Sequence, residues 1–462
     1  MSSCSVTIPQ RSPGDKKQRF SRLMQDNLIQ TNVTVIGAGL AGMASAIHLA
    51  RAGLDVVCVE PEIEACNIVG ESLDWSAPEL LRVLGLPMER LLAEEIATYK
   101  KYVTVRTEDG RMRQYIPGEW LGRPPWNVEL RTLHVDRVRL RKALGEILLG
   151  HGVKVMADRV SEVTREGQRV TALRTEGGKQ IQSPWFIDAS GFAASLFPRL
   201  FRLPAYEYGP RKVAIWSYFT VADAVEGTTL YMDAGQPPYL EWVWEIPIHR
   251  NTISVGYVAP GDAIGEMRRQ GRGVDEILVE SMRRFSRFAP LLEDATNPST
   301  QVTSFRCRVH RGVAGPNWLI AGEAASMVDP MTSNGVTAAL RHAEEASRLI
   351  IRHFHRQRLP YPSRALYSRR VLELAKFFNS GIEKVIYEWP VRNAIGVANA
   401  GEIYTIPAWV MNAVYSRARP RGVIGTSLFC MFLAFLRWCA SILNWLCRRG
   451  RQLSPSPAVA AS

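Results

Sequence analysis

Hydrophobic and polar positions change period several times in the first part of the chain. Residues 33–36 form a short, nearly continuous apolar run, as in a buried strand, and residues 56–60 form a second one. Between them lies a glycine-rich turn and then a helical pattern over about residues 41–52, which Gly53 ends. Strand, turn, helix and strand in this order predict a βαβ unit with two parallel strands.

Strand-like and helix-like segments alternate along the rest of the chain. Residues 99–107 and 111–116 flank the turn dipeptide Asp109-Gly110 and predict a hairpin. An amphipathic helix fits residues 134–150, short strands fit 153–190 and 213–258, strand, turn and helix fit 318–353, and helices dominate 362–416. We therefore expect an α/β protein, α+β overall, with a Rossmann-type domain, a β-sheet substrate domain and a helical C-terminal region.

The glycine-rich turn has the pattern G-x-G-x-x-G, in Gly37-Ala38-Gly39-Leu40-Ala41-Gly42. The first glycine of such a turn permits the tight bend, the second lets the backbone approach a pyrophosphate, and the third allows close helix–strand packing. Glu60 ends the second strand and can accept hydrogen bonds from ribose hydroxyls. The pattern predicts a dinucleotide site made by Gly37, Ala38, Gly39, Gly42 and Glu60, and the alternative is a purely structural glycine turn.

Three further segments resemble the flavin monooxygenase superfamily. Residues 318–325 with Asp329-Pro330 resemble its second FAD motif, in which Gly322 and Glu323 stand where Gly-Asp is usual. Asp188-Ala189-Ser190-Gly191 resembles the middle motif, and Arg137 resembles the arginine that supports the cofactor. The resemblance implies FAD as cofactor, with Arg137, Asp188, Gly322, Glu323 and Pro330 among its binding residues. No second G-x-G-x-x-G follows, so electrons are expected from transient NAD(P)H binding or from a separate flavin reductase.

Residues 31–350 also resemble flavin-dependent halogenases, most specifically in Trp242-x-Trp244-x-Ile246-Pro247. Residues 69–73 and the Asp329-Pro330 segment with Ser333 and Gly335 add to this resemblance. Trp242 and Trp244 share one face of a strand and would line a substrate pocket. The alternative is a core strand filled with aromatic side chains. The geranylgeranyl reductase branch carries a related aromatic strand.

In that family, reduced FAD, dioxygen and halide yield hypohalous acid, which a lysine activates for attack on the substrate. Residues 97–101 match the position of that lysine, and the preceding aromatic residue selects Lys100. Neighbouring strand residues face opposite ways, so Lys100 and Lys101 lie on different faces, and periodicity alone does not show which face is buried. An exposed strand lysine is the alternative.

The segment around Ser333 departs from the tryptophan halogenases. Thr332 stands where those enzymes carry a catalytic glutamate, which disfavours a tryptophan substrate. Ser333, Asn334 and Gly335 are expected to form the loop at halide and flavin, because successive backbone N–H groups can hold an anion.

Composition changes this interpretation little. The chain has 462 residues and a formal net charge of +13, and its seven cysteines show no metal-binding or disulfide spacing. We therefore expect no metal site and a cytoplasmic protein. Nucleic acid is an improbable partner, because the basic excess is concentrated in residues 391–462, with eight arginines and one acidic residue.

Residues 422–447 are apolar and long enough to span a membrane, but Arg437 and Asn444 interrupt them. A helix on the membrane surface fits as well as a span, and a helix packed on the protein's own core is the alternative. The expected division of the chain is a flexible basic leader (1–30), a discontinuous FAD-binding domain (31–205 and 305–355), a β-rich substrate domain (206–304), a helical region (356–420), a membrane-associated helix (421–451) and a disordered tail (452–462).

These features together predict an FAD-dependent oxidoreductase that halogenates a small organic molecule. A flavin monooxygenase or a geranylgeranyl-reductase-like enzyme acting on a lipophilic substrate is the second hypothesis. A membrane-tethered flavin protein without catalysis is the third, and the Glu323 substitution is its support.

Overall fold

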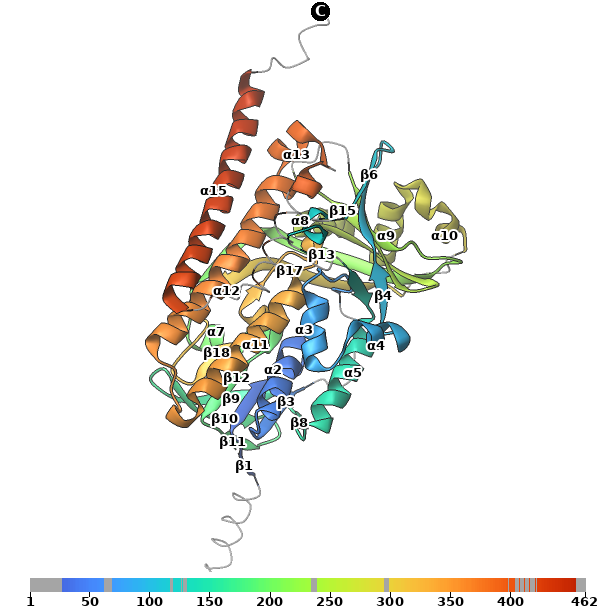
Figure 1. Cartoon of the computed structure of the whole chain (residues 1–462). Coiled ribbons are helices and arrows are strands. Elements are labelled where there is room, and N and C mark those ends of the chain that lie inside the picture. The colour runs from blue at the N-terminus through green and yellow to red at the C-terminus, as the bar shows by residue number, and fades with distance from the viewer. Residues whose placement is uncertain are drawn as a thin grey trace, which may run out of the picture.

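The computed structural model describes residues 27–61, 69–116, 119–125, 127, 131–233, 239–294, 299–397, 399–403, 407, 411, 415, 420 and 422–453. A five-stranded parallel sheet forms the centre of the nucleotide-binding part (Figure 1). Its order is β18 (Trp318–Ile320), β12 (Trp185–Asp188), β2 (Val33–Ile36), β3 (Val56–Glu60) and β8 (Lys154–Ala157). Helices α2 (Leu40–Arg51), α5 (Arg137–Gly150) and α11 (Gly335–His353) pack together beside it. The predicted α/β fold with its βαβ unit is confirmed, since β2 and β3 pair in parallel around α2.

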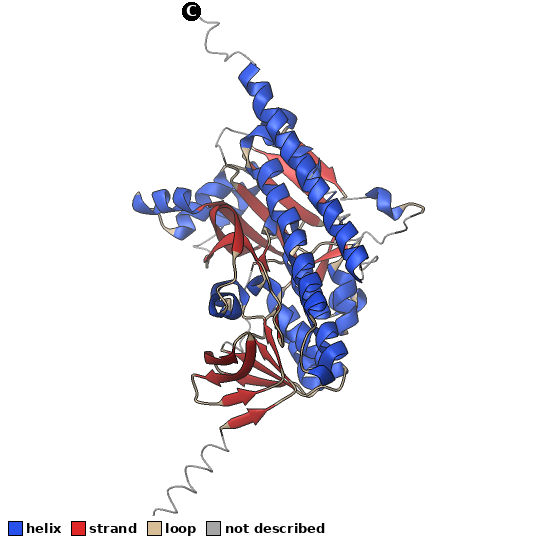
Figure 2. Cartoon of the chain, turned by 90° about the vertical axis from the view of Figure 1, so that its left-hand side faces the viewer, coloured by secondary structure: helices blue, strands red, loops and turns tan. Residues whose placement is uncertain are grey.

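A four-stranded sheet lies at the lower end of the molecule (Figure 2). Its order is β1 (Leu28–Gln30), β11 (Gln180–Gln182), β10 (Arg169–Thr175) and β9 (Val160–Glu166). The predicted end of the flexible leader at residue 30 was therefore wrong, because residues 28–30 form a strand that pairs in parallel with β11. The rest of the predicted leader up to residue 26 lies outside the described residues.

The large sheet has eight strands and fills the upper half of the molecule (Figure 1). Its order is β19 (Ser326–Met327), β17 (Gln301–His310), β13 (Ala205–Thr220), β16 (Thr252–Pro260), β15 (Trp242–His249), β14 (Gly227–Met232), β5 (Tyr102–Thr107) and β6 (Met112–Tyr115). The predicted hairpin is present as β5 and β6, but its predicted first strand (99–107) is divided, because residues 97–100 form a separate strand that pairs with residues 132–135. The predicted domain boundaries were wrong here, because β5, β6, β17 and β19 belong to this sheet rather than to the FAD-binding domain. Pairing of β5 with β14 joins segments more than a hundred residues apart, which local patterns do not reveal.

Different helices cover the two faces of the large sheet. One face packs against α8 (Gly261–Arg269), α9 (Val274–Arg283) and the segment around Phe288. The other face, which carries Trp242 and Trp244, packs against α12 (Tyr361–Ile382), the π-helix η6 (Glu383–Tyr387) and α13 (Trp389–Ile395). Helices α12, η6 and α13 lie in the predicted helical region (356–420), and helices α8 to α10 lie within the predicted β-rich residues 206–304.

The remaining elements connect these layers. Strands β4 (Ala97–Lys100) and β7 (Thr132–Val135) pair antiparallel between the two larger sheets. The short helices are α3 (Ala77–Leu84), α4 (Met88–Ala93), α6 (Gly191–Ala194), α7 (Leu196–Leu200), α10 (Ala289–Asp294), η1 (Glu119–Gly122), η2 (Ser286–Phe288), η3 (Gly322–Ala324), η4 (Pro330–Thr332) and η5 (Phe354–Arg356).

The C-terminal helix α15 (Gly422–Leu453) runs along α12 at the outer side of the molecule (Figures 1 and 2). Its segment Gly422–Arg449 is long and apolar enough to cross a membrane, by length and composition alone. The helix extends two residues into the predicted disordered tail, whose residues from 454 onward lie outside the described part of the chain.

Candidate active site

The glycine-rich turn after β2 has the geometry expected of a dinucleotide site. Gly37 adopts a φ of +94°, and a Cβ on it would meet the Ala189 carbonyl oxygen at 2.4 Å. A Cβ on Gly42 would meet the Gly37 carbonyl oxygen at 1.9 Å, so the helix packs directly against the turn. A Cβ on Gly39 would meet nothing within 4 Å. The turn is therefore closely packed at Gly37 and Gly42 and open at Gly39, where a pyrophosphate would approach the N-terminus of α2.

Glu60 and Asp188 differ in what they can offer a cofactor. Glu60 is partly buried and accepts a hydrogen bond from the Ala38 backbone N–H at 2.6 Å, which places its carboxylate at the mouth of the turn. Asp188 is fully buried and accepts hydrogen bonds from Ser190 and from the Phe197 backbone N–H. The structure therefore places Asp188 behind the turn, as a support for the segment that touches Gly37, and gives it no contact surface for a ligand.

Glu323 and Arg137 lie close enough for the charge of the arginine to act on the glutamate carboxyl. The Glu323 side chain is open to solvent, yet the surrounding protein raises the pKa of its carboxyl, and Arg137 partly offsets this effect. Arg137 donates to the Gly70 carbonyl oxygen at 3.0 Å and so contacts the segment of residues 69–73. Gly322 has a φ of +64° and approaches Ala41 on α2, which brings the two predicted FAD motifs together.

Lys100 is buried at the end of β4, with 4% of its surface exposed. Its Nζ donates to Ser72 Oγ at 2.9 Å, to the Leu73 carbonyl oxygen at 3.1 Å and to Ser333 Oγ at 3.4 Å. Lys101 points the other way, is exposed, and pairs with Glu226. The structure thus joins Lys100 to residues 69–73 and to the loop around Ser333, three segments that the sequence resemblance had singled out separately.

Electrostatics distinguish Lys100 from an ordinary surface lysine. Burial lowers the pKa of the Lys100 amine to about 7, although the nearby Asp74 works in the opposite direction. A lysine that titrates near neutrality can exist both as an ammonium donor and as a nucleophilic amine at physiological pH. A buried lysine with such a lowered pKa is a candidate for catalysis.

The loop between β19 and α11 carries Pro330, Ser333, Asn334 and Gly335. Ser333 adopts a left-handed conformation with a φ of +58°, and its hydroxyl donates to Ser72 Oγ at 3.0 Å. Thr337, in the first turn of α11, donates to Asp74 at 2.7 Å. A Cβ on Gly335 would meet nothing within 4 Å, so the start of α11 is open. The loop therefore fits a place between the predicted flavin site and Lys100.

A buried cluster of charged residues that sequence reasoning missed contacts this loop through Asp329. Lys212, 1% exposed, bonds Asp329 at 2.8 Å and lies 3.5 Å from Glu383. Burial works to lower the pKa of the Lys212 amine, but Asp329 and Glu383 outweigh it and raise the value. Tyr387 adds a hydrogen bond to Asp329 at 3.1 Å. Lys212 is thus held as an ammonium, in contrast to Lys100. No local pattern marked it, because its partners lie far along the chain.

Trp242 and Trp244 are both buried, on the same face of β15 as predicted. Trp242 Nε1 donates to Tyr387 Oη at 3.0 Å, and Trp244 Nε1 donates to Ser254 Oγ at 3.0 Å. Gly256 opposite leaves room for the Trp244 ring, because a Cβ there would lie 2.2 Å from it. In this structure the two side chains are packed parts of the core, and a role in lining a substrate pocket stays a prediction.

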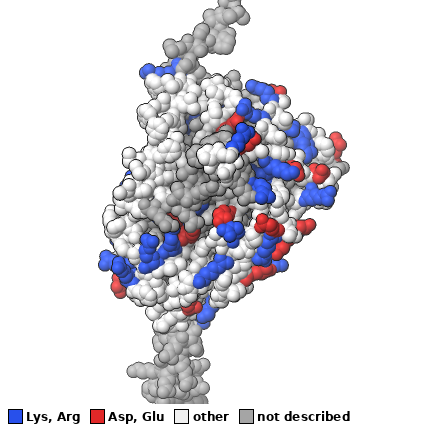
Figure 3. Space-filling view, in the orientation of Figure 1, with Lys and Arg blue, Asp and Glu red and all other residues white. Residues whose placement is uncertain are grey.

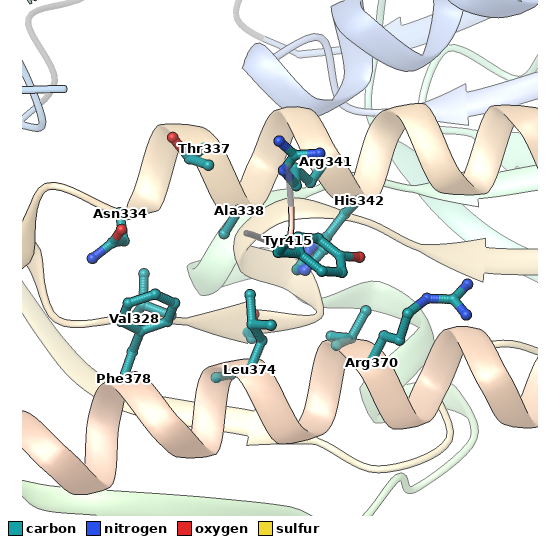
Figure 4. A pocket seen from close by; sticks show the side chains of 13 residues that line it. Val328, Asn334, Thr337, Ala338, Arg341, His342, Arg370, Leu374, Phe378 and Tyr415 are labelled. Carbon is teal, nitrogen blue, oxygen red and sulfur yellow. The ribbon is translucent and has the colours of Figure 1, made fainter. Parts of the chain in front are cut away.

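A pocket lies between α11 and α12, beside the N-terminus of α11 (Figure 4). Asn334 and Thr337 mark its end toward the loop, while Arg341, Phe378 and Tyr415 line its other sides. The space open to water is about 20 Å³, enough for one molecule. Within the described residues, Ser326 Oγ and His342 Nδ1 make no hydrogen bond, and both residues line this pocket. As it stands, the pocket suits a bound water better than an aromatic substrate.

Comparisons with known proteins agree with these features. The profile of the tryptophan halogenase family matches residues 125–376, and that of the lycopene cyclase proteins matches residues 32–209. The chain is 29% identical to the tryptophan 2-halogenase of Chondromyces crocatus, over 68% of this chain and 59% of that one. It is 28% identical to the sulochrin halogenase of Aspergillus terreus, over 67% of this chain and 61% of that one. The chain thus spans about six-tenths of the length of these relatives.

Among solved structures, a triple mutant of the flavin-dependent brominase Bmp2 superposes with a TM-score of 0.69. It is 21% identical and covers 86% of this chain and 97% of its own, so the likeness concerns the fold.

Proposed function

The chain belongs to the tryptophan halogenase family, and we propose that it is an FAD-dependent enzyme that uses reduced FAD, dioxygen and halide to halogenate a small organic molecule. The observation that carries this proposal is Lys100. Its amine is buried, has a pKa lowered to about 7, and contacts the loop that follows the second FAD motif. This combination of burial, lowered pKa and contact with the loop supports a catalytic role.

The residues present fit FAD. The open side of the glycine turn at Gly39 suits the pyrophosphate, Glu60 suits the ribose, and Gly322 with Glu323 suits the flavin. When bound and reduced, FAD would supply the two electrons that reduce dioxygen to the peroxide level, at which it can oxidise halide to hypohalous acid. A separate flavin reductase or NAD(P)H is the proposed source of those electrons, since the sequence has no second dinucleotide fingerprint.

Lys100 is proposed to orient or carry the electrophilic halogen. As an ammonium its Nζ exchanges its long hydrogen bond to Ser333 for one to hypohalous acid. As a neutral amine its nitrogen bonds the halogen while the oxygen–halogen bond breaks, and the amine proton leaves with the hydroxide as water. Both forms are accessible because the pKa is near neutrality. Ser333, Asn334 and Gly335 would hold the halide at the open start of α11, where helix and backbone N–H groups favour an anion.

Bromide turnover tests the proposal. Purified protein, FAD, a flavin reductase, NADH and bromide would be incubated with phenols, pyrroles, prenylated lipids and tryptophan, and the products read by mass spectrometry. We expect brominated product from a compound other than tryptophan, because Thr332 replaces the glutamate of tryptophan halogenases. Lys100→Ala should abolish it, whereas Lys101→Ala, which removes the exposed neighbour, should not.

A second activity would show itself in the same assay. Oxygenated or saturated lipid products that do not depend on halide would refute halogenation and support a monooxygenase or geranylgeranyl-reductase-like enzyme. The lycopene cyclase match covers residues 32–209 alone, whereas the tryptophan halogenase match covers residues 125–376, so halogenation is the favoured proposal.

We also propose that α15 attaches the protein to the cytoplasmic surface of a membrane. The polarity of this helix is the reverse of that of an ordinary surface helix. Between Val423 and Leu446, every side chain classed as exposed is apolar, for instance Ile424 at 77% and Trp438 at 60%. The polar side chains face the protein instead: Arg437 pairs with Glu373, and Asn444 bonds Glu388. A helix that lies on lipid needs this arrangement, whereas a solvated one does not.

Charge supports a lipid surface as the occupant. Figure 3 shows the flank along α15 almost without charged atoms and with basic side chains at its upper end. Arg448 and Arg449 are exposed there, and the Arg449 guanidinium stacks on Trp445 at 4.3 Å. Tryptophan and arginine together suit the headgroup region. Because Arg437 and Asn444 are engaged with neighbouring helices, the helix is proposed to lie on the membrane rather than to span it.

Flotation with vesicles tests this attachment. Full-length protein should float with phosphatidylcholine vesicles that contain phosphatidylserine, and less with phosphatidylcholine alone. The triple variant Leu428→Glu, Phe435→Glu and Trp438→Glu should stay at the bottom, while Leu149→Glu, equally exposed but far along the chain, should float normally. A wild-type protein that does not float, or that forms a stable dimer through this face without lipid, would refute the proposal.

A further inference from the structure

Lys100 heads a chain of buried hydrogen bonds that leads away from the candidate site. Its Nζ lies 2.9 Å from Ser72 Oγ, which lies 3.0 Å from Thr228 Oγ1. Thr228 Oγ1 in turn lies 2.9 Å from His134 Nε2. All four residues are buried, and they come from β4, the segment after residue 69, β14 and β7. Segments far apart in sequence thus meet in one continuous polar line.

The donors at the start of this chain determine its direction. An ammonium can only donate, so Ser72 Oγ accepts from Lys100. Ser333 Oγ also donates to Ser72 Oγ. The single proton of Ser72 is therefore left for Thr228, and the proton of Thr228 for His134. His134 must then accept through a bare Nε2.

The other side of His134 agrees with this tautomer. Its Nδ1 lies 3.5 Å from Thr98 Oγ1, and the Thr98 hydroxyl donates a hydrogen bond to the Pro247 carbonyl oxygen at 2.8 Å. Thr98 is thus placed to accept from an N–H on Nδ1. Burial, and then the positive charge of Lys100, lower the pKa of His134 well below its usual value, so the ring stays neutral.

Other ionisable groups lie on the elements packed around the chain. Glu71 and Asp74 belong to the segment that carries Ser72, Asp136 follows β7, and Glu245 and His249 belong to β15. Of these, Asp74 is the one whose charge acts on Lys100, and it favours the ammonium. His249 pairs with Asp136 at 3.0 Å and lies outside the chain. The chain is therefore the polar contact through which His134 can act on the amine.

We propose that His134 is a positioning residue for Lys100. As a neutral acceptor at the far end, it turns every hydroxyl of the chain away from the amine, so that Ser72 presents a lone pair to Nζ and stabilises the ammonium form. Without that acceptor, the Thr228 and Ser72 hydroxyls are free to reverse, and Ser72 then donates to the neutral amine. The proposal rests on the proposed catalytic role of Lys100, and it assigns to His134 the balance between the two forms of that lysine.

Paired substitutions test this positioning role at two points of the chain. Thr228→Val keeps the shape of the side chain but removes its hydroxyl, whereas Thr228→Ser keeps the hydroxyl. At the end of the chain, His134→Leu removes the acceptor, and His134→Gln retains one. Thr229→Val, an equally buried threonine on the same strand, is the matched control.

The first readout is the pH profile of bromination. In Thr228→Val and His134→Leu we expect the pH of half-maximal activity to fall by about half a unit to one unit, the size of one ordinary hydrogen bond. Thr228→Ser, His134→Gln and Thr229→Val should keep the wild-type profile. Equal shifts in Thr228→Val and Thr228→Ser, or no shift in any variant, would overturn the proposal.

The second readout does not depend on turnover. The difference in unfolding free energy between each variant and its Lys100→Met double mutant, followed over pH, locates the titration of Lys100 directly. If this titration moves in the two chain-breaking variants while no protein makes brominated product, the positioning role stands and the proposed function fails. If bromination occurs and the titration of Lys100 does not move, the proposed function stands and the positioning role of His134 fails.

Discussion

Replacing Lys100 by methionine should stabilise the protein at neutral pH, which is the reverse of what a structural lysine would do. The amine titrates near pH 7 in the folded chain and near 10.5 when unfolded. Between these values the unfolded chain holds a proton that the folded chain has released, so the wild-type stability rises by about 1.4 kcal/mol with each pH unit. At pH 7 the buried amine therefore lowers the free energy of unfolding by about 4 kcal/mol.

Lys100→Met removes this cost and leaves few buried groups unsatisfied. The Leu73 carbonyl oxygen still accepts from Thr132 Oγ1, and Ser72 still accepts from Ser333. We expect the variant to exceed the wild type by up to about 4 kcal/mol at pH 7, less the three hydrogen bonds it gives up. The difference should fall by about 1.4 kcal/mol with each pH unit above pH 7.

Urea denaturation at pH 7, 8 and 9 measures this difference. Lys101→Met provides the control, because that side chain is exposed and its difference from the wild type should not change with pH. A Lys100→Met protein that is less stable than the wild type at pH 7, or a difference that stays constant from pH 7 to pH 9, would refute the reasoning. The amine would then be a structural donor, and the strongest support for catalysis at this residue would be gone.

Three further substitutions test other parts of the site. Gly39→Ala should leave the melting temperature unchanged but weaken FAD binding in a fluorescence titration, because its Cβ meets no protein atom and instead occupies the place of the pyrophosphate. Tight FAD binding by this variant would contradict the placement of the cofactor. Gly42→Ala should yield little folded protein on expression, since its Cβ would lie 1.9 Å from a backbone oxygen, and a normal yield would show that the turn can move. Lys212→Met should lower the unfolding free energy in urea by about 3–5 kcal/mol, because Asp329 would remain buried without its cation. An unchanged stability would mean that the cluster takes up a proton instead.

Local chemistry explains why much of the nucleotide-binding part was predictable. A short apolar strand, a glycine turn and a helix are neighbours in sequence, and the steric roles of Gly37 and Gly42 act within a few residues. The hairpin at Asp109-Gly110 is local in the same sense. Asp188 shows the limit of this reasoning, because its motif was recognised while its carboxylate proved to be turned toward Ser190 and Phe197.

The candidate catalytic centre depended on contacts across the chain. Sequence pattern singled out Lys100 and Ser333, but the burial of Lys100 follows from the packing of β4 between the two larger sheets. His134, Thr228 and Lys212 carried no local signal, because each gains its meaning from a partner many residues away. A hydrogen bond between distant residues leaves no periodicity in the sequence.

The C-terminal helix shows the same division most clearly. Sequence alone determined that residues 422–447 are apolar, helical and interrupted by Arg437 and Asn444, because hydropathy and helix length are properties of consecutive residues. Tertiary structure alone decided which side of that helix faces the protein and which side is exposed. By packing against α12, η6 and α13, the helix turns its polar side chains inward and leaves its apolar ones outside, since a half-buried arginine needs a carboxylate and Glu373 supplies it.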